Sequence, residues 1–114
     1  MNPTPGQVYW AYRDKRRPVI VVSRNSLNSG NRIVVVPLTS ARLEERRSLR
    51  NCVLLDPRRH GLPKACVAQT ELIATIDMRD LIVNEGPITT IDGETLRRLV
   101  RAIGYMMDAE CEPA

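Results

Sequence analysis

Two pairs of polar residues stand at the ends of apolar, β-branched runs, where they could act on a phosphate group. Arg16 and Arg17 come just before PVIVVS, and Thr39 and Ser40 come just after VVVPL. A guanidinium can bind a phosphate in bidentate fashion and stabilise its transition-state charge. A threonine hydroxyl can donate a hydrogen bond to a phosphate oxygen. The alternative is that all four residues simply terminate strands, and residue types alone do not separate the two interpretations.

RNA is a substrate on which such groups could suffice, because it carries its own nucleophile, the 2′-hydroxyl. A ribonuclease can therefore work mainly by positioning and electrostatics. The sequence offers little for other schemes: it has one histidine, His60, and lacks the HExxH, Walker A, GxGxxG and GxSxG patterns. Its carboxylates are dispersed, so we predict neither a metal nor a cofactor. His60 lies in a basic turn and is predicted to be at the surface.

The composition favours a small globular protein with an anionic partner. The chain has 114 residues and 43% apolar residues, which suits one domain spanning residues 1–114. Aromatic residues make up 4%, without Phe, so the core must be aliphatic and an oligomer interface would help to stabilise it. The net charge is +4, and of 17 basic residues only Lys15 and Lys64 are lysines. An arginine excess suits a phosphate-bearing or acidic partner, although a high-GC genome would also produce it.

The cysteines and the N-terminus indicate a cytoplasmic protein. Cys52, Cys66 and Cys111 form an odd set without CxxC spacing, which disfavours a disulfide framework and a zinc site. The N-terminal residues show neither the basic nor the apolar region of a signal peptide. Apolar runs such as residues 33–36 are far too short to span a bilayer, so we expect no membrane association.

The first half of the chain predicts three strands. Residues 7–13 (QVYWAYR) and 18–24 (PVIVVSR) are rich in β-branched and aromatic residues and flank a charged turn. Residues 32–39 (RIVVVPLT) form the third strand, in which Pro37 indicates an edge or a bulge because proline cannot donate to a ladder. Residues 40–51 are polar and charged, and are compatible with a short helix or a loop.

The second half adds shorter strands and one helix. Residues 52–55 (CVLL) predict a strand, residues 65–76 (ACVAQTELIATI) a strand or strand pair, and residues 78–81 a helical turn. Several short strands followed by one helix favour a mainly β fold, a small barrel or sandwich capped by a C-terminal helix.

The C-terminal helix is predicted to begin after Asp92, a good N-cap. Its apolar face comprises Leu96, Leu99, Val100, Ile103, Met106 and Met107. Arg97, Arg98 and Arg101 fall on the other face, which we interpret as a solvated surface.

Several segments, in their order along the chain, resemble the motifs of the MazF/PemK family of toxins. Residues 5–10 (PGQVYW) resemble the family's opening strand, residues 16–23 (RRPVIVVS) its RPVLVIS-like second strand, and residues 34–40 (VVVPLTS) its VVPITS-like third strand. Residues 59–67 (RHGLPKACV) resemble the turn and strand that follow, and residues 71–77 (ELIATID) the (D/E)QIRTID signature. No single piece is specific, but the ordered set is.

The resemblance implies an SH3-like small β-barrel, the fold of MazF, PemK and CcdB toxins, in a protein that forms a homodimer. It implies metal-independent cleavage of single-stranded RNA to a 2′,3′-cyclic phosphate and a 5′-hydroxyl, and neutralisation by a cognate antitoxin with an acidic tail. The family's catalytic arginine and threonine correspond to Arg17 and Thr39. The residues expected to contact the RNA are Arg16, Ser40, Gln69 and Glu71.

Three departures from the family pattern bear on activity. The turn between Tyr12 and Arg16 is short, where the family usually has a longer, glycine-containing loop over the groove. Leu72 replaces a base-reading glutamine, and Ala74 replaces an arginine. We expect Arg16 to supply a phosphate contact in compensation. Two alternatives stay open: a CcdB-like toxin that inhibits gyrase by binding, and an inactive nucleic-acid-binding relative.

Overall fold

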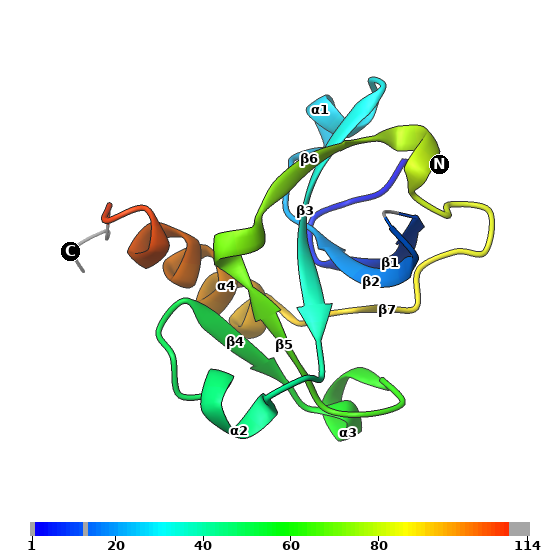
Figure 1. The fold of residues 1–114 in the computed structure, drawn as a ribbon. Coiled ribbons are helices and arrows are strands. Elements are labelled where there is room, and N and C mark those ends of the chain that lie inside the picture. The colour runs from blue at the N-terminus through cyan, green and yellow to red at the C-terminus, as the bar shows by residue number, and fades with distance from the viewer. Residues whose placement is uncertain (1, 13, 110–114) are drawn as a thin grey trace.

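A computed structural model describes residues 2–12 and 14–109 and gives seven short strands and one long helix (Figure 1). The strands are β1 (Gln7–Tyr12), β2 (Arg16–Val21), β3 (Arg32–Thr39), β4 (Cys52–Leu55), β5 (Cys66–Gln69), β6 (Ala74–Asp77) and β7 (Thr89–Thr90). The helices are α1 (Asn25–Asn28), α2 (Leu43–Arg46), α3 (Pro57–His60) and α4 (Gly93–Met106), with 3₁₀ turns η1 (Thr70–Leu72) and η2 (Met78–Asp80). Arg13, at the predicted end of the first strand, and Cys111 lie outside the described residues.

The strand β3 is the centre of the sheet and pairs with three other strands. The strand order is β4-β5-β3-β2-β1-β7, with β6 also paired to β3, and all pairs are antiparallel. In Figure 1, β6 runs beside one half of β3 and β5 beside the other half. The sheet therefore curls into a half-barrel with α4 at its side, as predicted for a mainly β fold with a C-terminal helix.

Pro37 lies inside β3 without breaking it. The Val22 N–H donates to the Val34 carbonyl at 3.0 Å, and the alternation of the ladder leaves Pro37 in a non-hydrogen-bonded pair with β2. Its nitrogen therefore points to the other side of β3, between the stretch paired with β6 and the stretch paired with β5. Pro37 thus marks a change of strand partner, not the edge or bulge that was predicted.

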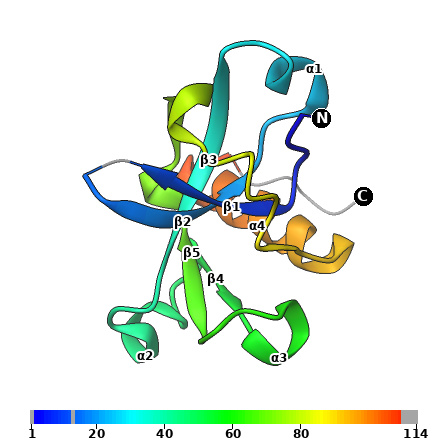
Figure 2. The ribbon, with the colours of Figure 1, turned by 90° about the vertical axis from the view of Figure 1, so that its right-hand side faces the viewer.

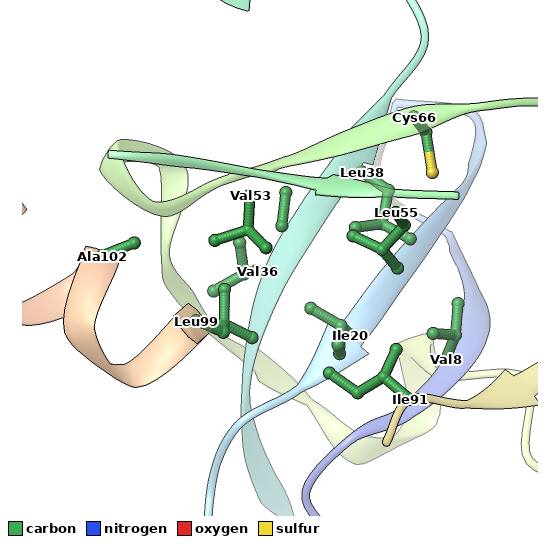
Figure 3. Packing of buried hydrophobic residues seen from close by; sticks show 11 residues of the cluster. Val8, Ile20, Val36, Leu38, Val53, Leu55, Cys66, Ile91, Leu99 and Ala102 are labelled. Carbon is green, nitrogen blue, oxygen red and sulfur yellow. The ribbon is translucent and has the colours of Figure 1, made fainter. Parts of the chain in front are cut away.

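Two aliphatic clusters lie on either side of the curled sheet. The larger one joins β1 to β5 with α4, and Figure 3 shows Leu99 and Ala102 of α4 pointing toward Val53 and Val36. The smaller one covers the opposite face, where η2 and the segment after it close the sheet. Its buried members are Tyr9, Ala11, Val19, Val21, Ile33, Val35 and Leu81. Residues along β2 and β3 alternate between the two clusters, so consecutive residues are buried at 19–21 in β2 and at 35–36 in β3.

The helix α4 begins where the sequence predicts, because the Asp92 carboxylate accepts the Thr95 N–H at 2.7 Å. Its apolar stripe is only partly buried. Leu99 is 1% exposed, whereas Val100 is 59% exposed. Arg97, Arg98 and Arg101 are exposed, as predicted for the other face.

The uncertain segments resolve into short elements. Residues 40–51 contain α2, and residues 65–76 form two strands separated by η1, with η2 as the predicted helical turn. His60 corrects the prediction of a surface residue, since it is only 5% exposed. The helical turn α3, which Asp56 caps through the Arg58 N–H, turns His60 inward. Arg59 ties this turn to α4 through ion pairs with Asp92 at 2.7 Å and Glu94 at 3.2 Å.

Cys52 and Cys66 are free thiols, and both are buried. Among the described residues, no helix combines the length and the apolar character that a bilayer crossing needs.

A substitution of Leu55 tests how much the larger cluster contributes to stability, because this side chain is only 1% exposed within the cluster. We expect Leu55→Ala to lower the free energy of unfolding by about 2–5 kcal/mol, since it removes buried contacts and leaves a cavity. Leu49→Ala, at a residue that is 48% exposed, is the matched control and should cost less than about 1 kcal/mol. Urea unfolding followed by circular dichroism measures both. Equal losses in the two variants would contradict this assignment of the core.

Candidate active site

The predicted arginine and hydroxyl pairs meet in one recess. It has a volume of about 290 Å³ and lies where the β1–β2 hairpin approaches the end of β3 and the loop before β5. The polar residues that line it are Lys15, Arg16, Arg17, Thr39, Ser40 and Lys64. The other lining residues are Trp10, Pro18, Leu38, Leu62, Pro63, Cys66 and Ile88. Four of the six predicted site residues thus come together, and all the charged groups in the lining are cations.

Strand register explains this convergence. The β1–β2 hairpin pairs Tyr12 with Arg16, two residues along the same face from Trp10, and the Arg16 guanidinium lies over the Trp10 ring. β3 delivers Thr39 at its end, where Thr39 pairs with Val67 of β5. Both approaches depend on β3, because β2 and β5 pair with it at neighbouring positions.

Arg17 is held by a carboxylate that the sequence analysis did not identify. Its Nε donates to Asp14 Oδ1 at 3.1 Å and its Nη2 donates to Oδ2 at 3.3 Å. The hydrogen bond from Arg17 lowers the pKa of the Asp14 carboxyl to about 2, and the same pairing raises the pKa of Arg17. The guanidinium is permanently charged and oriented, yet 41% of its side chain remains exposed to an incoming anion.

Arg16 is positioned by an aromatic ring and a second carboxylate. Its guanidinium carbon lies 5.0 Å from the centroid of the Trp10 ring, within the range of a cation–π contact. Its Nη2 donates to Glu85 Oε1 at 2.6 Å. Each arginine of the pair therefore has its own acidic partner, and each still lines the recess.

The Thr39 hydroxyl already accepts one hydrogen bond from the backbone. Its Oγ1 accepts the N–H of Ala41 at 3.1 Å, which leaves the hydroxyl proton available for donation. Thr39 and the neighbouring Ser40 are both half-buried. One or two hydroxyl donors facing several cations form a site suited to a phosphate with developing negative charge.

The walls of the recess hold functional candidates that sequence reasoning missed. Trp10 and Lys64 line it, and the register of Trp10 opposite Pro18 would have placed the ring there once the hairpin was paired. Asp14 stands three residues before Arg17 in the charged turn, a spacing that signals the ion pair. Burial raises the pKa of the Cys66 thiol to about 11, so this sulfur is protonated and apolar in character near neutral pH.

Gln69 and Glu71 do not line this recess. Gln69 stands at the far end of β5 from Cys66 and is buried, and its Nε2 donates to Glu71 Oε2 at 3.3 Å. Asn51 Nδ2 donates to Glu71 Oε1 at 2.8 Å. The length of β5 thus separates this amide–carboxylate cluster from Arg17, and an RNA contact by either residue stays a prediction. Leu72, where the family has glutamine, is exposed on η1.

Fold and recess together define a small β half-barrel with an arginine-lined recess. The family model for PemK-like, MazF-like toxins of type II toxin-antitoxin systems matches residues 3–107. The chain therefore belongs to this toxin family.

Comparison with solved structures agrees with this assignment. The chain is similar to the Mycobacterium tuberculosis toxin MazF-mt6, at 25% identity and a TM-score of 0.79, over 92% of this chain and 99% of that one. An endoribonuclease in complex with its cognate antitoxin, from mycobacterial species, gives 21% identity, a TM-score of 0.79, and coverage of 96% and 99%. A MazE–MazF structure from Deinococcus radiodurans gives 18% identity and a TM-score of 0.75, over 94% of this chain and 96% of that one. Among curated proteins, none matches the sequence.

The Asp14–Arg17 pair can be tested by titration. We expect the Asp14 carboxyl to have a pKa of about 2 and Arg17→Gln to return it toward the ordinary value of 3.8. A lowered pKa in the folded state means that the pair stabilises the fold above the unfolded pKa, about 3.9, and that this contribution disappears as pH falls through about 2. The pair is exposed, so its contribution to stability is small.

Carboxyl NMR chemical shifts measure this pKa directly. Asp77 is the internal control, because the hydrogen bond from Arg79 lowers its pKa and Arg17→Gln leaves that pair intact. An Asp14 pKa that does not change in Arg17→Gln would show that the two side chains are not paired in solution.

Proposed function

We propose that this toxin is an endoribonuclease that cuts single-stranded RNA in the arginine-lined recess. The observation that carries the proposal is the meeting of Arg16 and Arg17, at the start of β2, with Thr39, at the end of β3, in one recess. The phosphate chemistry expected of these residue types and the toxin family both support it.

The proposed reaction is an internal transesterification. The 2′-oxygen attacks the adjacent phosphorus, the bond from phosphorus to the 5′-oxygen breaks, and a 2′,3′-cyclic phosphate and a 5′-hydroxyl result. One proton leaves the 2′-hydroxyl and one is taken up by the 5′-oxygen, so water is not consumed. Arg17 stabilises the negative charge that develops on the phosphoryl oxygens, and Thr39 donates a hydrogen bond to one of them.

The surrounding residues would place the substrate for this step. Arg16 would bind a neighbouring phosphate, with Trp10 behind it to limit its movement. Ser40 would add a second hydroxyl donor. Asp14 would keep the Arg17 fork oriented before RNA arrives, which reduces the reorganisation needed in the transition state. The proposed step uses side chains alone, so we expect the reaction to proceed without a metal or cofactor.

The structures similar to this chain suggest a protein partner for it. One neighbour is an endoribonuclease solved with its cognate antitoxin, and another is a MazE–MazF structure. We infer that this toxin also has a cognate antitoxin, and that an acidic segment of it competes with RNA for the cationic recess. In the two open alternatives, gyrase inhibition and binding without activity, Arg17 and Thr39 have no catalytic role.

The cleavage proposal is tested with a long single-stranded RNA in EDTA, with 5′-end mapping of the products. We expect wild-type protein to cut it, Arg17→Ala to lose on the order of 10²- to 10³-fold in rate, and Thr39→Val to lose about 10²-fold. Arg79→Ala is the control, because Arg79 forms the same kind of bidentate pair with Asp77 outside the recess. Its rate should be unchanged.

Three results would count against the proposal. Intact RNA after long incubation would favour one of the two binding alternatives. Cleavage that requires added magnesium would refute the metal-independent mechanism. Equal rates for Arg17→Ala and Arg79→Ala would remove Arg17 from the reaction.

We further propose that the toxin is a homodimer. An apolar groove of about 430 Å³ lies between α1 and α4, and Leu27 and Val100, both 59% exposed, stand on its walls. Exposed apolar surface of this kind is typical of an interface. A second copy of the chain is the occupant that fits the family resemblance and the small aliphatic core.

Light scattering after size-exclusion chromatography tests the dimer. We expect a dimer for wild-type protein and a shift toward monomer for Val100→Lys, because burying an unpaired ammonium is costly. Tyr12→Lys, at a residue that is 57% exposed and outside the groove, is the control and should remain dimeric. A monomeric wild type, or a dimeric Val100→Lys variant, would refute this interface.

A further inference from the structure

A second cationic recess lies apart from the first, between α4 and the segment that leads into β4. It has a volume of about 340 Å³. Its charged and aromatic lining residues are Arg47, Arg50, Arg98, Arg101 and Tyr105. Arg98, Arg101 and Tyr105 are spaced three and four residues apart, so they share one face of α4. Val100, which lines the apolar groove, is on a different face of this helix.

Two arginines of α4 bring positive charge to this recess without an acidic partner among the described residues. Within residues 2–12 and 14–109, Arg98 and Arg101 form no ion pair. Arg47 contacts Glu44 at 3.5 Å, and both side chains are exposed. Burial, and after it the charge of Glu71, raises the pKa of Cys52 in the recess wall. The Glu71 carboxylate itself accepts hydrogen bonds from Asn51 and Gln69.

An aromatic surface accompanies these cations. The Arg50 guanidinium carbon lies 4.2 Å from the centroid of the Tyr105 ring, and the ring is 39% exposed. A guanidinium stacked on an aromatic ring offers flat faces on which a nucleobase can stack, next to forks that bind phosphate.

One exposed segment connects the two recesses. Ser40, at its start, lines the first recess, and Arg47 and Arg50, near its end, line the second. Arg42 and Arg46 lie between them, together with Glu44 and Glu45, so residues 40–51 carry four arginines and two carboxylates. Arg42 has a φ of 51°, a left-handed conformation that is uncommon for a residue with a side chain. Such conformations concentrate at functional positions.

We propose that the second recess binds the backbone of single-stranded RNA after the strand leaves the first recess and crosses the segment 40–51. The inference rests on the proposed function, because it takes the cleaved RNA as the occupant. A polyanion with a charge on every nucleotide matches two cationic recesses joined by a segment in which arginines outnumber carboxylates, whereas a single acidic side chain would occupy only one recess. Arg98 and Arg101 then contact phosphates, and Tyr105 contacts a base.

The test measures binding of an RNA that cannot be cut. Fluorescein-labelled oligouridylates that are fully 2′-O-methylated lack the nucleophile, and lengths of 5 and 15 nucleotides distinguish occupancy of one recess from occupancy of both. Anisotropy titrations over a range of sodium chloride give affinity and salt dependence. The variant is the double substitution Arg98→Ala with Arg101→Ala. The control is Arg79→Ala with Arg97→Ala, which removes the same charge outside both recesses.

We expect the 15-mer to bind the Arg98/Arg101 variant at least about tenfold more weakly than wild type. The plot of log affinity against log salt should become less steep by about 1.4, which is about 0.7 for each of two lost phosphate contacts. The 5-mer is too short to occupy both recesses, so its affinity should change less than that of the 15-mer, and the control should behave as wild type. Circular dichroism melting confirms that both double variants are folded.

Equal 15-mer affinity in the variant and wild type would overturn the inference, and so would equal weakening in the variant and the control. If a labelled oligoglutamate binds only when Arg98 and Arg101 are present, while the 15-mer has the same affinity for the variant and wild type, the recess would be assigned to an acidic protein instead. Cleavage of unmodified RNA is assayed in parallel. Variant-dependent 15-mer binding without any cleavage would overturn the proposed function alone, and cleavage without variant-dependent binding would overturn this inference alone.

Discussion

The backbone pairing of β3 is the constraint on which the rest of the structure depends. One strand of eight residues carries β2 along one side, and β6 and then β5 along the other. This sharing curls the sheet into a half-barrel, and it also brings the β1–β2 hairpin and the end of β3 to the same recess. Pro37 fits because its nitrogen, which has no proton to donate, points to the gap between the two ladders. The position that looks like a break in the sequence is where the sheet changes partner.

Electrostatics then prepares the recess for an anion. Asp14 and Glu85 each hold one arginine, and both pairs are exposed, so each contributes little to stability. Their effect is on orientation, since a fork fixed by a carboxylate or stacked on Trp10 loses less conformational entropy when a phosphate arrives. The hydroxyl of Thr39 is fixed in a similar way by the backbone of Ala41. Preorganised donors of this kind are the main resource of a site built from arginine and hydroxyl groups.

Much of the fold could be read from local pattern. The β-branched runs gave the strands, and Asp92 gave the start of α4, because short-range hydrogen bonding and alternation act within a few residues. The prediction that His60 is at the surface was wrong. One turn of helix, capped by Asp56, buries this residue although the surrounding sequence is basic. The partial burial of α4 could not be predicted from the sequence either. Helical spacing places both Leu99 and Val100 on the apolar face, and only packing against the sheet shows that Leu99 is buried and Val100 exposed.

The sequence by itself determined the element types, the aliphatic core and the proposed chemistry of Arg17 and Thr39, because residue type and ordered motifs carry that information locally. Only the tertiary structure decided which candidates meet. It joined Arg16, Arg17, Thr39 and Ser40 in one recess with Trp10, and it put Gln69 and Glu71 at the other end of β5. It also gathered arginines from α4 and from the segment before β4 into a second recess. Strand register and helix packing act across long sequence separations, so spacing along the chain does not reveal these meetings.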